Sequence, residues 1–180
     1  MVILIGGSSH VGKTLLAQRL LERLKYPCVS LDHLKMGFIR SGMTELTVED
    51  DLEMRYFMWP FVVGMIKTAV ENEQDLIIEG CYIPAEWKDS FEESYLESIR
   101  SVFLVMSESY LREHEDDLGR YASVIERRLC DEIDIERLIM CSAGFKRDCI
   151  ECGTPYIEID GEYDIDDILN RTLRICGQEG

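Results

Sequence analysis

"MVILIGGSSHVGKT", residues 1–14, joins a short apolar run to a glycine-rich turn. Counted from Gly7, the turn fits the pattern G-x-x-x-x-G-K-[ST], which Gly12, Lys13 and Thr14 complete. In this pattern the glycines let successive backbone N–H groups point at phosphate oxygens. The stretch therefore predicts a loop that binds the phosphates of a nucleoside triphosphate.

The segments on either side of this turn have the patterns that such a loop requires. Residues 2–5 form a continuous apolar run, typical of a strand buried on both faces of a parallel sheet. Leucines recur at helical spacing over residues 14–25, which predicts a helix whose N-terminal dipole points at the phosphates. Lys13 is expected to reach the β and γ phosphates, and the Thr14 hydroxyl is expected to bind Mg²⁺. The expected ATP-binding residues of the loop are Gly7, Ser8, Ser9, His10, Val11, Gly12, Lys13, Thr14 and Leu15.

The composition indicates one compact domain spanning residues 1–180, with 46% hydrophobic residues. The 35 acidic and 19 basic residues give a formal net charge of −16, which argues against binding to nucleic acid or to anionic membranes. A small anionic ligand held in a local positive pocket remains compatible with that charge. No apolar window is long enough for a transmembrane span, and the start lacks the features of a signal peptide.

The seven cysteines are an odd number, and without an export signal we expect them to be reduced thiols of a cytoplasmic protein. Cys149 and Cys152 form a C-x-x-C pair, and no second pair at similar spacing accompanies it. The pair is compatible with a metal site, but ordinary cysteines near the end of a helix explain it better.

Apolar runs and helical patterns alternate along the rest of the chain. Further strands are expected at residues 28–31, 75–80, 101–106 and 155–159. A loop containing Gly37 and Gly42 is expected after Asp32, and Pro60 is expected to separate two helices after a capping box at residues 47–50. A last helix is expected between an Asp164 N-cap and a Gly177 stop. This alternation predicts an α/β fold in which helices cover both faces of a parallel sheet.

No N-K-x-D guanine signature follows the fourth expected strand, which argues against a GTPase. The N-terminal loop, an acid at the end of strand two, an acid-glycine pair at the end of strand three and an arginine-bearing segment after strand four together resemble the nucleoside monophosphate kinase group. This group includes adenylate, shikimate and gluconate kinases. The resemblance implies a three-layer P-loop fold with a five-stranded parallel sheet in the order 2-3-1-4-5. It also implies a helical acceptor-binding region at about 33–73 and a short lid at about 116–130.

The resemblance assigns roles to residues outside the loop. Asp32 is expected to deprotonate or contact the acceptor, although it would also suit an N-cap of a following helix. Glu79 is expected near Mg²⁺ and its waters or near the acceptor, because a buried acid without a partner is costly. Arg120 and Arg127 are expected in the lid, where they would stabilise charge during transfer. Gly161 is expected to contact adenine, or only to form the turn into the last helix.

The remaining candidates concern the acceptor. Arg40 and Arg55 are expected to hold an anionic group of the acceptor, Gly80 is expected to let it approach the backbone, and Tyr82 and Trp87 to line its pocket. The sequence thus predicts a Mg²⁺-dependent transfer of the γ-phosphoryl group of ATP to a small molecule, preferably to a hydroxyl. An adenylate- or cytidylate-like nucleoside monophosphate kinase and a regulatory nucleotide-binding protein without fast transfer remain alternatives.

Overall fold

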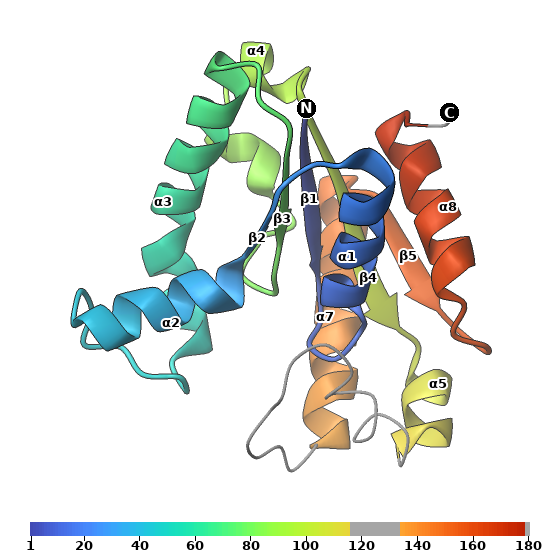
Figure 1. The fold of residues 1–180 in the computed structure, drawn as a ribbon. Coiled ribbons are helices and arrows are strands. Elements are labelled where there is room, and N and C mark those ends of the chain that lie inside the picture. Colours follow the sequence, from blue (N-terminus) through green and yellow to red (C-terminus); the bar gives the residue numbers. More distant parts are fainter. Residues whose placement is uncertain (116–133, 179–180) are drawn as a thin grey trace.

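The computed structural model describes residues 1–115 and 134–178. One sheet of five parallel strands has the order β2-β3-β1-β4-β5, as the resemblance implies (Figure 1). The strands are β1 (Val2–Gly7), β2 (Cys28–Ser30), β3 (Leu76–Glu79), β4 (Ile99–Met106) and β5 (Tyr156–Ile159). Since all five strands run in the same direction, their carboxyl ends meet at one edge of the sheet.

Helices cover both faces of this sheet (Figure 1). The α-helices are α1 (Lys13–Leu24), α2 (Leu31–Ser41), α3 (Asp51–Glu71), α4 (Glu93–Leu96), α5 (Glu108–Glu113), α7 (Ile135–Cys152) and α8 (Ile165–Cys176), and the 3₁₀ helix is η1 (Trp87–Ser90). Side chains of α1, α5 and α8 pack in one core cluster, and side chains of α2, α3 and η1 pack in another. No helix among the described residues is long and apolar enough to cross a lipid bilayer.

Strand β1 lies at the centre of the sheet and contributes to both cores. Val2 and Leu4 belong to the cluster with α3, whereas Ile3 and Ile5 belong to the cluster with α1, and all four side chains are fully buried. This alternation follows from the two-residue period of a strand. A strand with two buried faces reads as a continuous apolar run, which is why the first residues decided the fold class.

The predicted loop after Asp32 is wrong, because residues 31–41 form helix α2. Strand β2 ends at Ser30, which is the N-cap of α2, so Asp32 lies in the first turn of a helix. A Cβ at Gly37 would meet nothing within 4 Å, so this glycine disturbs no packing. The helix ends at Gly42, whose left-handed conformation lets its N–H bond to the carbonyl of Ile39.

The predicted break at Pro60 is also wrong, because α3 continues through this residue. Buried residues recur every three or four positions on both sides of the proline: Met54, Met58, Val62, Ile66 and Ala69. Packing of this continuous apolar face outweighs the hydrogen bond that a proline removes from a helix. The predicted capping box at residues 47–50 does not cap α3. The Thr47 N–H donates to Asp50 Oδ2 over 2.8 Å, but the N-cap of α3 is Asp50, whose side chain makes no capping hydrogen bond.

Candidate active site at the carboxyl edge of the sheet

The turn between β1 and α1 has the shape that the sequence pattern predicts. Gly7 has a φ of 120°, and a Cβ on it would collide with the backbone of Leu104 in β4. Gly12 has a φ of 88° and is the N-cap of α1. Both positions need glycine, one for a close approach and both for a left-handed backbone. The chain between them therefore curls at the N-terminus of α1. The first backbone N–H groups of a helix have no partner within that helix.

Lys13 and Thr14 extend from the first turn of α1 toward the interior of this edge. The Lys13 ammonium donates to the Ser8 carbonyl over 2.6 Å, and the residue is 8% exposed. The Thr14 hydroxyl donates to Glu79 Oε2 over 3.4 Å. Lys13 thus lies across the turn, where phosphates would be held, and Thr14 reaches the end of β3.

Glu79 is the last residue of β3 and is 1% exposed. In the sheet it pairs with Ile5 of β1 on one side and with Ser30 of β2 on the other, so its carboxylate lies between the turn and the start of α2. A hydroxyl and a single carboxylate are the oxygen ligands that Mg²⁺ uses when phosphates complete its coordination. Thr14 and Glu79 therefore fit such an ion, and a cluster of three or more His, Cys, Asp or Glu residues suited to a metal is absent from the described residues.

The thiol of Cys81, the residue that follows Gly80, lies within electrostatic reach of both Lys13 and Asp32. Burial raises the pKa of Cys81, the Lys13 ammonium lowers it, and the Asp32 carboxylate raises it. These effects fall off with distance, so both charges must lie close to the residue that follows Gly80. The structure thereby brings together Asp32 from α2, Lys13 from α1 and the end of β3.

The acceptor candidates occupy different environments. The Arg55 guanidinium donates to the Cys81 carbonyl over 3.1 Å and lies 5.3 Å from the Phe145 ring centre, so it reaches the end of β3. Arg40 is exposed in the last turn of α2. A Cβ on Gly80 would lie 2.7 Å from the Leu31 Cβ, so the approach of α2 requires this glycine.

Tyr82 belongs to a polar cluster that the sequence did not reveal, in which the buried side chains of Lys35 and Tyr82 meet the exposed carboxylate of Asp51. The Lys35 ammonium, on a residue 7% exposed, donates to the Tyr82 hydroxyl over 2.7 Å, to Asp51 Oδ1 over 2.9 Å and to the Val48 carbonyl over 2.9 Å. The Tyr82 hydroxyl in turn donates to Asp51 Oδ1 over 2.9 Å. Burial and the nearby negative charges raise the pKa of Tyr82. This cluster fixes α2 and α3 to the segment after β3, and Lys35 lies one helical turn from Asp32.

The ends of β4 and β5 meet on the other side of the turn. Ser107 and Ser109 both donate to Asp160 Oδ1, over 2.7 and 3.1 Å, and these bonds lower the pKa of Asp160. Gly161 follows with a φ of 90° and an exposed position. Ser142 of α7 donates to the Met106 carbonyl over 2.8 Å, which ties α7 to the end of β4.

Other predicted residues lie apart from this edge. Arg120 and Arg127, with the predicted lid, lie outside the described residues. Trp87 is 2% exposed and donates to Ser101 Oγ within the core, so it lines no open pocket. Cys149 is fully buried in the core while Cys152 is exposed at the end of α7, which suits two separate free thiols.

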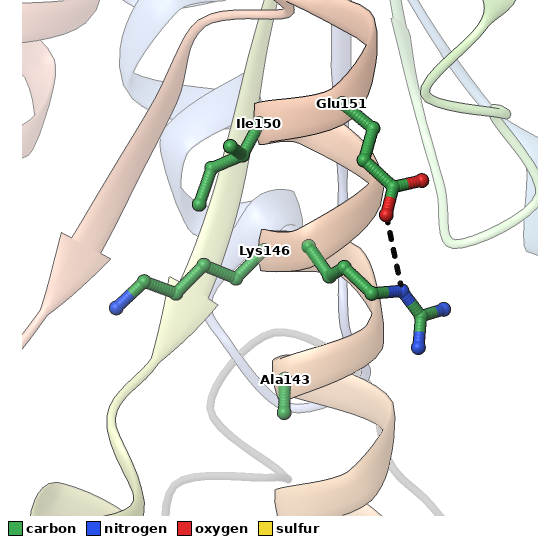
Figure 2. Close-up of a pocket in the computed structure, with 5 residues that line it drawn as sticks. Ala143, Lys146, Ile150 and Glu151 are labelled. Atoms are coloured by element: carbon green, nitrogen blue, oxygen red, sulfur yellow. Dashed lines mark ion pairs between the residues drawn. The ribbon is translucent and has the colours of Figure 1, made fainter.

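A hollow of about 320 Å³ lies on the outer surface of α7, away from the turn. Figure 2 shows the side chains of Lys146 and Glu151 extending to opposite sides of the helix, with Ile150 on the same side as Lys146. Lys146 forms an ion pair with Glu158 over 2.7 Å, so its charge is already compensated. This hollow contains none of the predicted site residues, and the carboxyl edge remains the candidate site.

No protein-family model and no curated protein sequence matches this chain. Solved structures do match it. A sugar kinase from Janibacter sp. HTCC2649 has a TM-score of 0.62 at 14% sequence identity, covering 98% of this chain and 94% of the other. A shikimate kinase from Bacteroides thetaiotaomicron has a TM-score of 0.56 at 18% identity, covering 98% of both chains.

A deoxyadenosine kinase from M. mycoides also matches, with a TM-score of 0.53 at 15% identity, covering 99% of this chain and 100% of the other. These proteins act on different acceptors, as their names state, so the likeness concerns the framework that they share. It agrees with the resemblance drawn from the N-terminal turn and the acids at the strand ends. The chain has the P-loop fold found in small-molecule kinases of the shikimate and nucleoside monophosphate kinase class.

Proposed function

We propose that this protein transfers the γ-phosphoryl group of ATP to a hydroxyl of a small molecule. The observation that carries the proposal is the contact between the Thr14 hydroxyl and the buried carboxylate of Glu79, 3.4 Å apart. This contact joins the N-terminal turn to the end of β3, and Asp32 enters the same region from α2. A phosphate-binding turn, a metal-ordering acid and a candidate base thus converge at one edge, as phosphoryl transfer requires.

The residues would divide the work as follows. The backbone of the turn and the Lys13 ammonium bind the phosphates and offset their negative charge. Thr14 and Glu79 would hold Mg²⁺, which supplies further neutralisation of charge on the β and γ phosphates. Asp32 accepts the proton of the acceptor hydroxyl while the oxygen bonds to the γ-phosphorus. The bond from that phosphorus to the β–γ bridging oxygen breaks, and ADP leaves.

The cations of the described acceptor region favour a hydroxyl over a phosphate as the accepting group. All three N–H donors of the Lys35 ammonium are taken by Asp51, Tyr82 and Val48. Arg55 remains as one guanidinium near the end of β3, and Arg40 is exposed. A nucleoside monophosphate carries about two negative charges at its phosphate and is bound best by several arginines.

An ATP-consumption screen tests the proposal directly. ADP release would be measured with sugars, amino sugars, nucleosides, hydroxy acids and nucleoside monophosphates, each with and without Mg²⁺. We expect one hydroxyl class to stimulate ADP release, and we expect Lys13→Ala to abolish that stimulation because the phosphates lose their cation. If only nucleoside monophosphates stimulate ADP release, the accepting group is a phosphate and not a hydroxyl.

The same screen contains the result that would refute transfer. If no acceptor stimulates turnover and Asp32→Asn leaves the basal rate unchanged, the proposed mechanism is wrong. Slow turnover together with nucleotide-dependent binding of a protein partner would then favour a regulatory nucleotide-binding protein.

We also propose that the protein works in the cytoplasm on small-molecule substrates and binds neither nucleic acid nor membranes. The described cysteines Cys28, Cys81, Cys141, Cys149, Cys152 and Cys176 are free thiols, which suits a reducing compartment. The net charge of −16 opposes binding to nucleic acid and to anionic lipid.

A further inference from the structure

Tyr163 lies between β5 and α8 and packs directly on the N-terminal turn. A Cβ placed on Gly12 would collide with the Tyr163 hydroxyl and would lie 3.1 Å from its Cζ atom. The tyrosine therefore touches the backbone of the turn at the residue that caps α1. Among the sequence patterns, Tyr163 is the last residue of the D-G-E-Y turn, whose Gly161 was expected near adenine.

The hydroxyl of Tyr163 is buried and has no hydrogen-bond partner among the described residues. Leaving a buried donor unpaired destabilises a protein, and native structures contain few such groups. Burial, with a smaller effect from Tyr110, raises the pKa of Tyr163 to about 12. The phenol therefore keeps its proton at neutral pH and remains available as a donor.

We propose that the Tyr163 hydroxyl is a nucleotide-binding group that donates a hydrogen bond to the phosphate chain held by the turn. The contact with Gly12 points to the α and β phosphates, because the backbone of such a turn surrounds these two groups. An O–H donor bonded to a phosphate oxygen forms a strong, charge-assisted hydrogen bond. The bound nucleotide would thus satisfy a donor that the rest of the described chain leaves unpaired. This inference rests on the nucleotide site of the proposed function.

Tyr163→Phe tests the inference because it removes only the hydroxyl and keeps the ring against Gly12. We expect Mg·ADP and Mg·ATP to bind about tenfold more weakly to the variant, measured by calorimetric titration without any acceptor. We also expect the melting temperature of the nucleotide-free variant to equal or exceed that of the wild type, because an unpaired buried hydroxyl is removed. A purely structural role of the hydroxyl would lower the melting temperature instead.

Tyr95→Phe is the matched control. Its hydroxyl donates to Glu71 Oε1 over 2.6 Å on an exposed surface, so its removal is expected to leave the affinity for nucleotides unchanged. Tyr163→Leu removes the ring as well and is expected to weaken binding at least as much as Tyr163→Phe.

Three results would overturn the inference. Tyr163→Phe binding Mg·ADP as tightly as the wild type would show that only the ring matters. A loss confined to Mg·ATP would place the hydroxyl at the γ phosphate and not at the α or β phosphate. A wild-type protein that binds neither nucleotide would overturn the proposed function itself, whereas the first two results leave that function intact.

Discussion

Asp32 has the proton-accepting role in the proposed reaction. It is half-buried in the first turn of α2, within electrostatic reach of the Cys81 thiol. Asparagine preserves the size of the side chain and removes its basicity, so we expect Asp32→Asn to lower kcat about 100-fold or more. Steady-state kinetics with the acceptor found by screening measure this change. Affinity for Mg·ADP should stay constant, since the turn binds the phosphates; an unchanged kcat would exclude Asp32 as the base.

Lys35 is expected to stabilise the acceptor side of the fold. Its ammonium joins α2 to Asp51 of α3 and to Tyr82, and its side chain is 8% exposed. Lys35→Met keeps the aliphatic chain but removes the ammonium that donates to the Tyr82 hydroxyl, the Val48 carbonyl and the Asp51 carboxylate. We expect the free energy of unfolding to fall by about 2 kcal/mol, as measured by urea denaturation.

Lys67→Met provides a control for the loss of a lysine charge. Lys67 pairs with the exposed carboxylate of Glu92 over 3.0 Å on the surface of α3, so its replacement should cost about 0.5 kcal/mol or less. Equal losses for the two variants would show that the polar cluster around Lys35 adds no special stability.

Local patterns explain which site residues the sequence could predict. Gly12, Lys13 and Thr14 stand in one continuous motif, and in the structure Gly12 caps α1 while Lys13 and Thr14 form its first turn. Lys35 escaped prediction because its partners Asp51 and Tyr82 are 16 and 47 residues away. The contact of Tyr163 with Gly12 likewise joins two ends of the chain. No spacing in the sequence predicts such contacts, because they depend on the order of the strands in the sheet.

At the scale of elements, the capping residues predicted for the last helix were confirmed, whereas a glycine and a proline did not keep their segments from forming helices. The N-cap at Asp164 and the stop at Gly177 delimit α8 as predicted, because each provides a specific hydrogen bond or backbone conformation. Gly37 was expected in a loop and Pro60 between two helices, yet both lie inside a helix. Glycine and proline lower the helical propensity of a segment, and buried apolar faces on α2 and α3 outweigh that effect.

Pro60 should therefore destabilise α3 without breaking it. The residue is exposed, and its ring leaves the Tyr56 carbonyl without the N–H that would follow it by four residues. Alanine restores this donor, although it also frees the unfolded chain. We expect Pro60→Ala to raise the free energy of unfolding by about 1–2 kcal/mol, as measured by urea denaturation.

Gly64→Ala, one turn further along α3, separates this effect from a general gain in helix propensity. Gly64 is exposed, and a Cβ there would meet nothing within 4 Å, so alanine should add about 0.5–1 kcal/mol. A destabilised Pro60→Ala variant beside a stabilised Gly64→Ala variant would show that the proline is needed for the local path of the helix.

At the scale of the whole molecule, the sequence predicted the layers and the parallel sheet, while the arrangement at the acceptor side came only from the structure. The alternation of short apolar runs with helices requires a sheet covered on both faces. The convergence of Glu79 with Asp32 and Lys13 depends on the register of β3 beside β1 and β2. The register of two strands sets which residues, more than 40 positions apart in the chain, lie opposite each other. The sequence of one strand alone therefore does not predict it.

The net charge of −16 on 180 residues should make the stability of the fold depend on salt. Repulsion between the excess carboxylates opposes the compact state, and dissolved ions screen it. Raising NaCl from about 0.01 M to about 0.1 M shortens the screening length from about 30 Å to about 10 Å. We expect the melting temperature to rise by about 2–4 °C over this range, which corresponds to about 1 kcal/mol.

A variant with less negative charge tests whether repulsion causes this rise. Glu45, Glu49 and Glu93 are exposed, and their joint replacement by glutamine removes three negative charges without changing the core. The melting temperature of the triple variant at low salt should exceed that of the wild type, and its response to salt should be smaller. Calorimetric scans at matched concentrations of NaCl and choline chloride compare the two proteins. Because ionic strength alone screens the charges, the two salts should raise the melting temperature equally. A response that differs between the salts would point to specific ion binding. An equal response to salt in the wild type and in the triple variant would show that net charge does not limit stability.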